Sequence, residues 1–197
     1  MAYVFQKLAK KASKAGISND FSQDSIDWFR DSARQVASVS APRLMNDKKN
    51  IVPSLTVQNI GQMFMYFYDP KYKDTLPYYD KFPLILLVDF TTDGFYGLNL
   101  HYLPPMFRAN LMDALYTLKN NDKYDDTTKL KLSYNVLKSA SKFKYFAPCF
   151  KKYLHSHVVG QFLYVQTENW DKALMLPTER FAKANKSRIF KDSMSMV

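Results

Sequence analysis

Residues 62–105 decide the fold of this chain. They read QMFMYFYDPKYKDTLPYYDKFPLILLVDF at positions 62–90 and TTDGFYGLNLHYLPP at positions 91–105. Three short, strongly apolar runs alternate with Asp, Pro and Gly, which favour turns over regular structure. Asp93-Gly94 separates two of these runs and is a common turn dipeptide. The stretch therefore predicts a compact antiparallel meander.

Length and composition favour one folded domain with an appended arm. The chain has 197 residues, of which 47% are hydrophobic and 16% aromatic, and this excludes general disorder. The first residues are polar and rich in lysine, without the apolar segment of a signal peptide. No apolar run approaches the roughly 20 residues that cross a bilayer, so we expect no membrane contact. A single cysteine, Cys149, excludes an internal disulfide framework and suits a reducing compartment.

Charge is distributed unevenly along the chain. The net charge is +10, but residues 60–103 carry −2, whereas residues 1–59 carry +4 and residues 104–197 carry +8. A positive field of this kind attracts nucleic acid or another polyanion. Solubility alone, or contact with an acidic protein partner, would also explain it.

Several lysines are predicted to share helix faces. At 100° per residue, residues 2–15 form a short basic amphipathic helix, and residues 126–144 form a helix with one lysine ridge. The lysines on these two faces are Lys7, Lys10, Lys11 and Lys14, and then Lys131, Lys138 and Lys142. The ridge has no acidic residue to pair with its lysines, unlike most salt-bridged helix faces. We interpret both faces as contacts for DNA or a protein partner; the alternative is ordinary solvated surface.

The C-terminal part of the chain is predicted to add one strand. Residues 148–155 are expected to form a short helix, residues 161–165 a strand, and residues 170–175 a helical turn. Residues 179–197 are expected to form a second basic arm. The candidate binding residues of this part are Lys151, Lys152, Arg180 and Lys183.

Aromatic residues beside cations are typical of single-strand or DNA-end binding, because rings stack on bases. Tyr72, Tyr78 and Tyr79 lie in the long turn between two predicted strands, close to Lys71 and Lys73. We therefore expect these three tyrosines to be the best exposed and to contact bases. The competing interpretation is a tyrosine-rich core with hydroxyls at its edge, which we favour for at least half of the tyrosines in the meander.

Familiar catalytic and metal-binding motifs are absent from the sequence. No glycine-rich phosphate loop, nucleophile elbow or zinc-protease helix motif occurs, and we expect no cofactor. Cys149, His155 and His157 lie close together but lack a further ligand pair at matching spacing, so we expect no metal site. Asp80 and Asp89 would suit a two-metal nuclease, yet both flank a predicted strand, where solvated side chains also explain them.

Three segments of the meander resemble a known protein family. Residues 65–71 (MYFYDPK), 76–83 (LPYYDKFP) and 94–105 (GFYGLNLHYLPP) are similar to DNA end protector proteins of T4-like contractile-tailed phages, of the type found in marine and cyanobacterial phages. The likeness extends through residues 130–134 and 176–181, so it covers most of residues 60–181.

This resemblance implies a structural virion protein and not an enzyme. Such a protein would sit at the end of packaged DNA near the head–tail junction, shield the terminus from host exonuclease and help to complete the head. It would contact the double-stranded DNA terminus and other virion proteins of the neck, portal or tail, in multiple copies within a symmetric assembly. Assembly would take place in the host cytoplasm.

These observations predict an α+β fold. A small antiparallel, aromatic-rich sheet or SH3-like partly open barrel would be packed with helices, with basic arms at both ends. Residues 1–55 would form the N-terminal arm and linker, residues 56–178 the globular core and residues 179–197 the C-terminal tail. Two other functions stay open: a neck or baseplate structural protein without DNA contact, and a metal-dependent phage nuclease that would lose cleavage in Asp80→Ala or Asp89→Ala.

Overall fold

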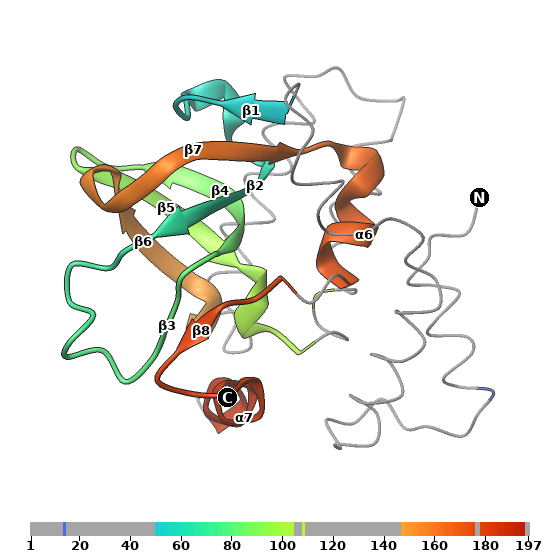
Figure 1. The fold of residues 1–197 in the computed structure, drawn as a ribbon. Helices are drawn as coiled ribbons and strands as arrows, with labels where there is room; N and C mark the ends of the chain where they lie inside the picture. The colour runs from blue at the N-terminus through green and yellow to red at the C-terminus, as the bar shows by residue number, and fades with distance from the viewer. Residues whose placement is uncertain (1–13, 15–49, 105–107, 109–146, 176–177, 196–197) are drawn as a thin grey trace.

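The computed structural model describes Lys14, residues 50–104, Arg108, residues 147–175 and residues 178–195 (Figure 1). Lys14 is helical and exposed. The other lysines of the predicted N-terminal helix, and the ridge formed by Lys131, Lys138 and Lys142, lie outside the described residues.

Most of the described chain forms one antiparallel sheet of six strands, in the order β1-β7-β2-β4-β5-β6. Its strands are β1 (Ile51–Val52), β2 (Met63–Tyr68), β4 (Leu84–Phe90), β5 (Gly94–Asn99), β6 (Phe150–Leu154) and β7 (Val158–Val165). A separate short ladder joins β3 (Tyr79–Asp80) to β8 (Phe181–Ala182). β2, β4 and β5 are antiparallel neighbours along the sheet, which confirms the predicted meander.

Short helices connect and cover the strands. They are η2 (Val57–Asn59), η3 (Leu100–Tyr102), η4 (Ala147–Cys149), η5 (His155–His157), η6 (Thr167–Asn169), α6 (Trp170–Met175) and α7 (Lys186–Ser195). The strand predicted at residues 161–165 is confirmed within β7, and the helical turn predicted at residues 170–175 is confirmed as α6. The Trp170 indole N–H donates to the Val165 carbonyl at 2.9 Å and fixes α6 to the end of β7.

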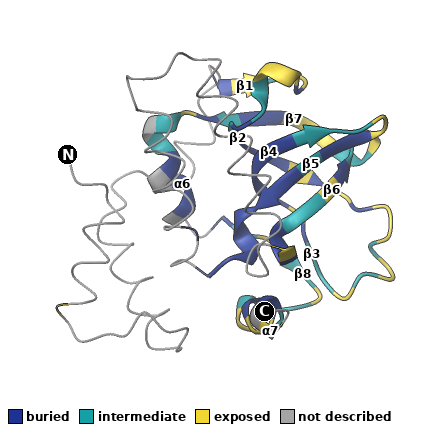
Figure 2. Ribbon diagram, turned by 180° about the vertical axis from the view of Figure 1, so that it is seen from behind, coloured by how far each residue is buried: buried dark blue, intermediate teal, exposed yellow. Residues whose placement is uncertain are grey.

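Most residues of β2 are buried (Figure 2). Their side chains alternate between two different clusters. Met63 and Met65 belong to an aliphatic cluster that includes residues from α6 and α7. Phe64 and Tyr66 belong to an aromatic cluster on the opposite face. In an antiparallel sheet, one face is commonly exposed to water. Here both faces carry buried clusters, so the aromatic face must also be covered.

The sheet covers its aromatic face by curling over it. The ring centroids of Tyr66 on β2 and Tyr153 on β6 are 5.5 Å apart, although three strand spacings of a flat sheet would separate those strands by about 14 Å. Phe95 on β5 and Phe162 on β7 likewise approach to 5.8 Å. The three-residue η5 requires this curvature, because β6 and β7 would lie about 19 Å apart in a flat sheet, beyond the reach of such a link. No ladder joins β6 to β7 in the described chain, so the curled sheet is not closed into a barrel.

Residues 150–154 form a strand, so the helix predicted at residues 148–155 is wrong. Their backbone pairs with β5, and Tyr153 is buried in the aromatic cluster. Strand pairing and burial outweigh the weak helical preference of the lysine pair. As neighbours in a strand, Lys151 and Lys152 point to opposite sides and do not share a helix surface.

Within the predicted basic C-terminal arm, residues 181–182 form β8 and residues 186–195 form α7. Ile189 and Phe190 of α7 are buried, whereas Arg188 and Lys191 are exposed. Lys186 at the start of α7 pairs with Glu179 at 2.8 Å.

Among the helices that the structure describes, none is both long and apolar enough to span a membrane.

The close approach of β5 and β6 predicts that adding a side chain at Gly94 destabilises the fold. A Cβ atom there would lie 1.9 Å from the carbonyl oxygen of Tyr153, and this backbone atom cannot move without separating the strands. We expect Gly94→Ala to lower the free energy of unfolding by about 1–3 kcal/mol, as overpacking does elsewhere. Urea denaturation would measure the loss.

Gly160 provides the matched control for this substitution. It has a φ of +84°, but a Cβ there would meet no atom within 4 Å, so Gly160→Ala adds only the cost of a left-handed conformation, about 1–2 kcal/mol. Wild-type stability of Gly94→Ala would contradict the close approach of β5 and β6.

Candidate nucleic-acid interface

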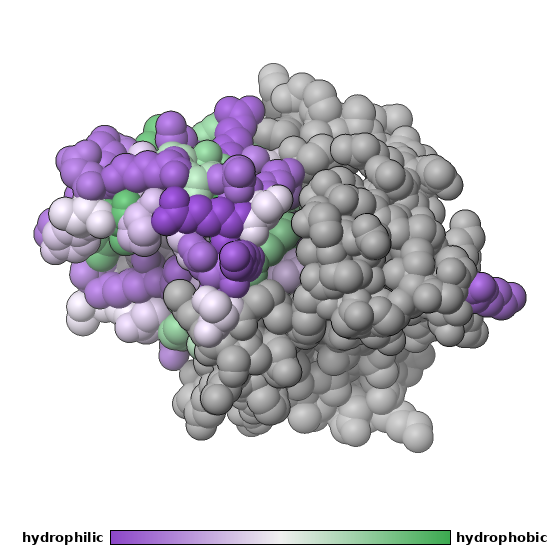
Figure 3. Space-filling model, turned by 90° about the horizontal axis from the view of Figure 1, so that it is seen from below, coloured by the Kyte–Doolittle hydropathy of each residue, from purple (hydrophilic) through white to green (hydrophobic). Residues whose placement is uncertain are grey.

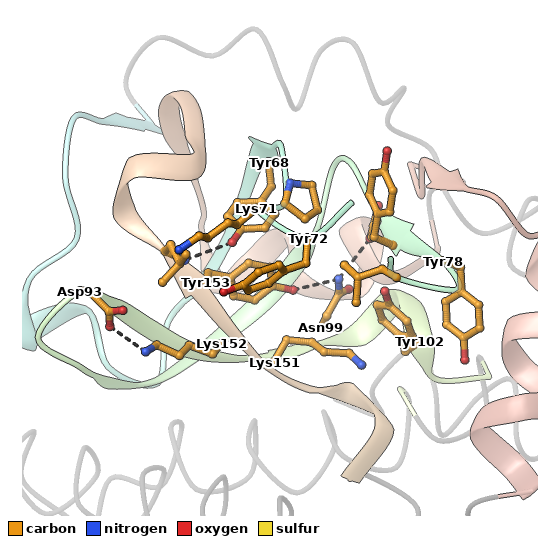
Figure 4. Close-up of a pocket in the computed structure, with 15 residues that line it drawn as sticks. Tyr68, Lys71, Tyr72, Tyr78, Asp93, Asn99, Tyr102, Lys151, Lys152 and Tyr153 are labelled. Atoms are coloured by element: carbon orange, nitrogen blue, oxygen red, sulfur yellow. Dashed lines mark hydrogen bonds and ion pairs between the residues drawn. The ribbon is translucent and has the colours of Figure 1, made fainter. Parts of the chain in front are cut away.

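A pocket of about 440 Å³ lies between β6 and the loop of residues 69–78, which joins β2 to β3 (Figure 4). Its tyrosines and lysines are Tyr68, Tyr72, Tyr78, Tyr79, Tyr102, Tyr153, Lys71, Lys151 and Lys152. Five of these were candidates from the sequence, and they come from two parts of the chain that the fold brings together. Rings beside ammonium groups suit the aromatic bases and phosphates of nucleic acid.

The loop of residues 69–78 is held by local hydrogen bonds. The Leu76 amide and the Thr75 hydroxyl both donate to the Tyr72 carbonyl, at 3.0 and 3.1 Å. Lys73 pairs with Asp69 at 2.9 Å. These contacts hold Tyr72 at the pocket with 62% of its surface exposed.

Lys183 fastens the same loop from the C-terminal segment. Its ammonium donates to the carbonyls of Asp74 and Leu76, at 2.9 and 3.1 Å. Lys183 also adopts a φ of +67°, a left-handed conformation that costs a residue with a side chain about 1–2 kcal/mol. The sequence indicates a contact with DNA or a partner here, whereas the structure gives Lys183 a positioning contact with the tyrosine loop.

The two adjacent lysines of β6 have different environments, as Figure 4 shows. Lys152 is exposed and pairs with Asp93 at 2.7 Å, an interaction that raises the lysine pKa and lowers the aspartate pKa. The Lys151 ammonium lies 4.5 Å from the centroid of the Tyr102 ring. Burial lowers the pKa of Lys151, and no hydrogen bond or ion pair joins its ammonium to a residue in the described ranges.

A buried polar network forms the floor of the pocket. Asn99 donates to the Tyr153 hydroxyl at 3.1 Å and to Asp80 at 3.2 Å. The second partner of Asp80 is His101, whose Nδ1 lies 2.6 Å from the carboxylate. The backbone amides of Phe82 and Arg180 donate to the other carboxylate oxygen. The network therefore fixes the pocket floor to β3, η3 and the C-terminal segment.

Asp80 is therefore not the solvated side chain that its position beside a predicted strand suggests. Burial by itself would raise the pKa of this carboxyl, but the charge and hydrogen bond of His101, with the Phe82 amide and Asn99, outweigh burial and lower it. His101 Nε2 contacts the Thr178 hydroxyl at 3.2 Å, which completes an Asp–His–Thr chain. All three side chains are buried, and neither His101 nor Thr178 lines the pocket. The contacts between Asp80, His101 and Thr178 therefore have a structural role.

The described residues do not assemble a recognisable metal site. Among them, no group of three or more His, Cys, Asp or Glu side chains is placed to hold a metal ion. Cys149 is buried, and burial raises its pKa to about 12. His157 contacts the Asp69 carbonyl through Nδ1 at 2.7 Å. In the described residues, the nuclease hypothesis therefore lacks the carboxylate cluster that it requires.

A second hollow of about 490 Å³ lies across the loop from the first. Lys81 and Lys183 are among its lining residues, together with the exposed side chains of Phe67 and Val159. Arg180 is exposed, and its guanidinium lies 5.5 Å from the centroid of the Phe67 ring. The predicted residues Arg180 and Lys183 are therefore separate from the tyrosine-lined pocket.

Sequence reasoning missed several residues of the pocket, among them Asn99, Tyr102 and Tyr153. These three residues are distant in sequence from the tyrosine loop, and the strand register places them beside it. The alternation of Lys151 and Tyr153 in residues 150–154 is the signal that would have placed both on one face of a strand.

Removing the Asp80 carboxylate should destabilise the fold in a pH-dependent way. Asp80→Ala leaves several interior donors without an acceptor, and we expect a loss of about 3 kcal/mol near neutral pH, measured by chemical denaturation. Because the folded-state pKa is lowered, Asp80 stabilises the fold above the ordinary carboxyl pKa of about 3.9, and this contribution is lost as pH falls through the lower folded-state value.

The stability difference between wild type and Asp80→Ala should therefore shrink below about pH 4. Asp74→Ala, which removes an exposed carboxyl of the neighbouring loop, is the control and should change stability little. A difference that widens in acid would contradict the assignment.

Comparison with known proteins identifies a family for nearly the whole chain. The family model for the phage T4 terminal DNA protecting protein matches residues 3–194. No curated protein and no solved structure gives a significant match.

The match confirms the resemblance drawn from residues 65–71, 76–83 and 94–105. The family is described as one that protects the terminus of phage DNA. The protein belongs to the phage T4 terminal DNA protecting protein family.

Proposed function

We propose that this protein covers the end of packaged DNA at the head–tail junction of the virion and shields it from host exonuclease. The family match over residues 3–194 is the observation that carries the proposal. The mechanism is steric and electrostatic: cations neutralise phosphates near the terminus while the folded domain occupies the space that a nuclease needs.

The described surface supports such a mechanism. Hydrophilic residues cover much of the described part of the face in Figure 3. Lys71, Lys152 and Arg180 are exposed around the two hollows, and Arg188 and Lys191 are exposed on α7. Each phosphate that such a cation neutralises releases counterions, which favours binding at low salt.

Rigidity supports the steric part of the mechanism. The tyrosine loop is held by Lys183, and the pocket floor by the Asp80 network, so both are arranged before a ligand arrives. A preorganised surface loses little conformational entropy on binding. The protein would act in the virion beside neck, portal or tail proteins, in several copies, after assembly in the host cytoplasm.

A second candidate function is a structural component of the neck or baseplate without DNA contact. Phe67 and Val159 favour it, because these cross-strand neighbours are 42% and 54% exposed and form an apolar part of the lining of the second hollow. Exposed apolar neighbours often mark protein interfaces. The two functions differ in one property: only the first requires affinity for a DNA end.

A salt series with linear duplex tests the proposed function. We expect binding to weaken by about 10³-fold between 50 and 200 mM salt if about six phosphates are contacted. Fluorescence anisotropy measures the affinity, and survival of the duplex under an added exonuclease measures protection. Unlabelled linear DNA should compete, whereas the same mass of closed circular DNA should compete poorly.

Two results would contradict DNA-end protection. Absence of binding at 50 mM salt would favour the structural role at the neck or baseplate. Equal competition by closed circles would show that the protein binds duplex without recognising its end.

A further inference from the structure

We propose that the pocket between β6 and the tyrosine loop holds one unpaired nucleotide of the DNA terminus, with its base against tyrosine rings and a phosphate against Lys151; this rests on the proposed function. The pocket would thus give the site its preference for an end over the body of a duplex.

The dimensions of the pocket favour a single nucleotide. Its volume of about 440 Å³ lies in the range of about 300–1,000 Å³ that is typical of small-ligand sites. A base pair inside a duplex cannot enter such a space without leaving its stack. Extruding a base costs a few kcal/mol in a duplex and least where the base is already unpaired, as at a frayed or overhanging end.

Ring faces on two sides of the pocket suit a base of any identity. Tyr72 projects from the loop and is 62% exposed, and the Lys71 ammonium lies 5.4 Å from the centroid of its ring. Tyr78 and Tyr102 lie on another wall, with ring centroids 6.1 Å apart (Figure 4). Every base has a face that can stack, so such a site tolerates sequence. A protein that covers a terminus gains from this tolerance.

Lys151 indicates that the ligand is an anion. An ammonium group has three donors, and the Lys151 ammonium makes a cation–π contact with Tyr102 but no hydrogen bond or ion pair within the described part of the chain. Two other charged groups of the lining are paired, Lys152 with Asp93 and Asp80 with His101, whereas the exposed Lys71 makes a cation–π contact with Tyr72. A phosphate would supply an acceptor that the described residues do not provide for Lys151. Its lowered pKa agrees with a partly desolvated cation.

Two phosphates could fill this position. One is the terminal 5′-phosphate of the unpaired nucleotide, and the other is the phosphodiester that joins the nucleotide to the duplex. Both present anionic oxygens to Lys151, and DNA with or without a 5′-phosphate distinguishes them.

The first experiment uses the full chain and a duplex with a one-nucleotide 5′ overhang of 2-aminopurine, whose fluorescence falls when the base stacks. We expect quenching when the protein binds, and tighter binding than to the matching blunt duplex. Tyr72→Ala should weaken binding of the overhang by about 5- to 150-fold, the range for one base stacked on an aromatic ring. Tyr72→Phe, which keeps the ring, should behave as wild type.

The second experiment tests the phosphate. Lys151→Gln should weaken binding of the overhang duplex, whereas Lys81→Gln removes an exposed lysine of the second hollow and should have a smaller effect. If removal of the 5′-phosphate from the DNA weakens wild type but not Lys151→Gln, the terminal phosphate is the ligand. If it weakens neither while Lys151→Gln still binds poorly, the ligand is the phosphodiester.

Failure of this inference differs from failure of the proposed function. If the protein protects linear duplex but leaves 2-aminopurine fluorescence unchanged, and Tyr72→Ala binds as wild type, nucleotide capture is overturned and end protection stands. If the protein binds no DNA at all, both are overturned. Circular dichroism of each variant shows that the fold is retained.

Discussion

The curvature of the sheet is the constraint on which the rest of this structure depends. A three-residue link joins the edge strand β6 to β7, so the sheet must bend until the two approach each other. Tyr66 lies at the centre of the bend, with its ring centroid 5.0 to 5.7 Å from those of Phe95, Tyr153 and Phe162. T-shaped and tilted pairs of this kind add stability beyond the area they bury. The same bend places β6 against the loop that follows β2, and the pocket exists because of it.

A second constraint is the buried carboxylate that joins the sheet to the C-terminal segment. Asp80 accepts hydrogen bonds from Asn99 on β5 and from the Arg180 amide before β8, and it contacts His101 in η3. A buried charge is costly unless it is fully paired, so any movement among these elements carries a large penalty. Lys183 extends the same connection to the tyrosine loop. Loop, floor and C-terminal segment therefore form one rigid unit.

The sequence predicts what depends on local pattern and misses what depends on register. Turn residues between apolar runs predicted the meander, and Tyr72 is as exposed as its place in a long turn suggests. Tyr78 and Tyr79, expected to be equally exposed, are only partly exposed, and Tyr79 lies in β3. Residues 150–154 were expected to be helical, because nothing nearby in the sequence shows that β5 supplies their hydrogen-bonding partners. Asp80 is separated from His101 by 21 residues, and Lys183 from Asp74 by 109, so no spacing rule connects them. From the sequence, the site is therefore predicted only as two separate parts, a turn rich in tyrosine and a pair of lysines. The strand register is what shows that these two parts lie together.

Net charge alone does not explain how a protein recognises an end. The phosphates at a terminus resemble those along the whole duplex, and interior sites greatly outnumber ends, so a purely electrostatic surface would be occupied away from the terminus. What an end offers in addition is a base that leaves its stack at low cost. Lys152, exposed and already paired with Asp93, suits general attraction, whereas Lys151 lies beside Tyr102 in a pocket that an unpaired nucleotide fits. Discrimination would then reside in the pocket and affinity in the surrounding cations, two properties that substitutions can separate.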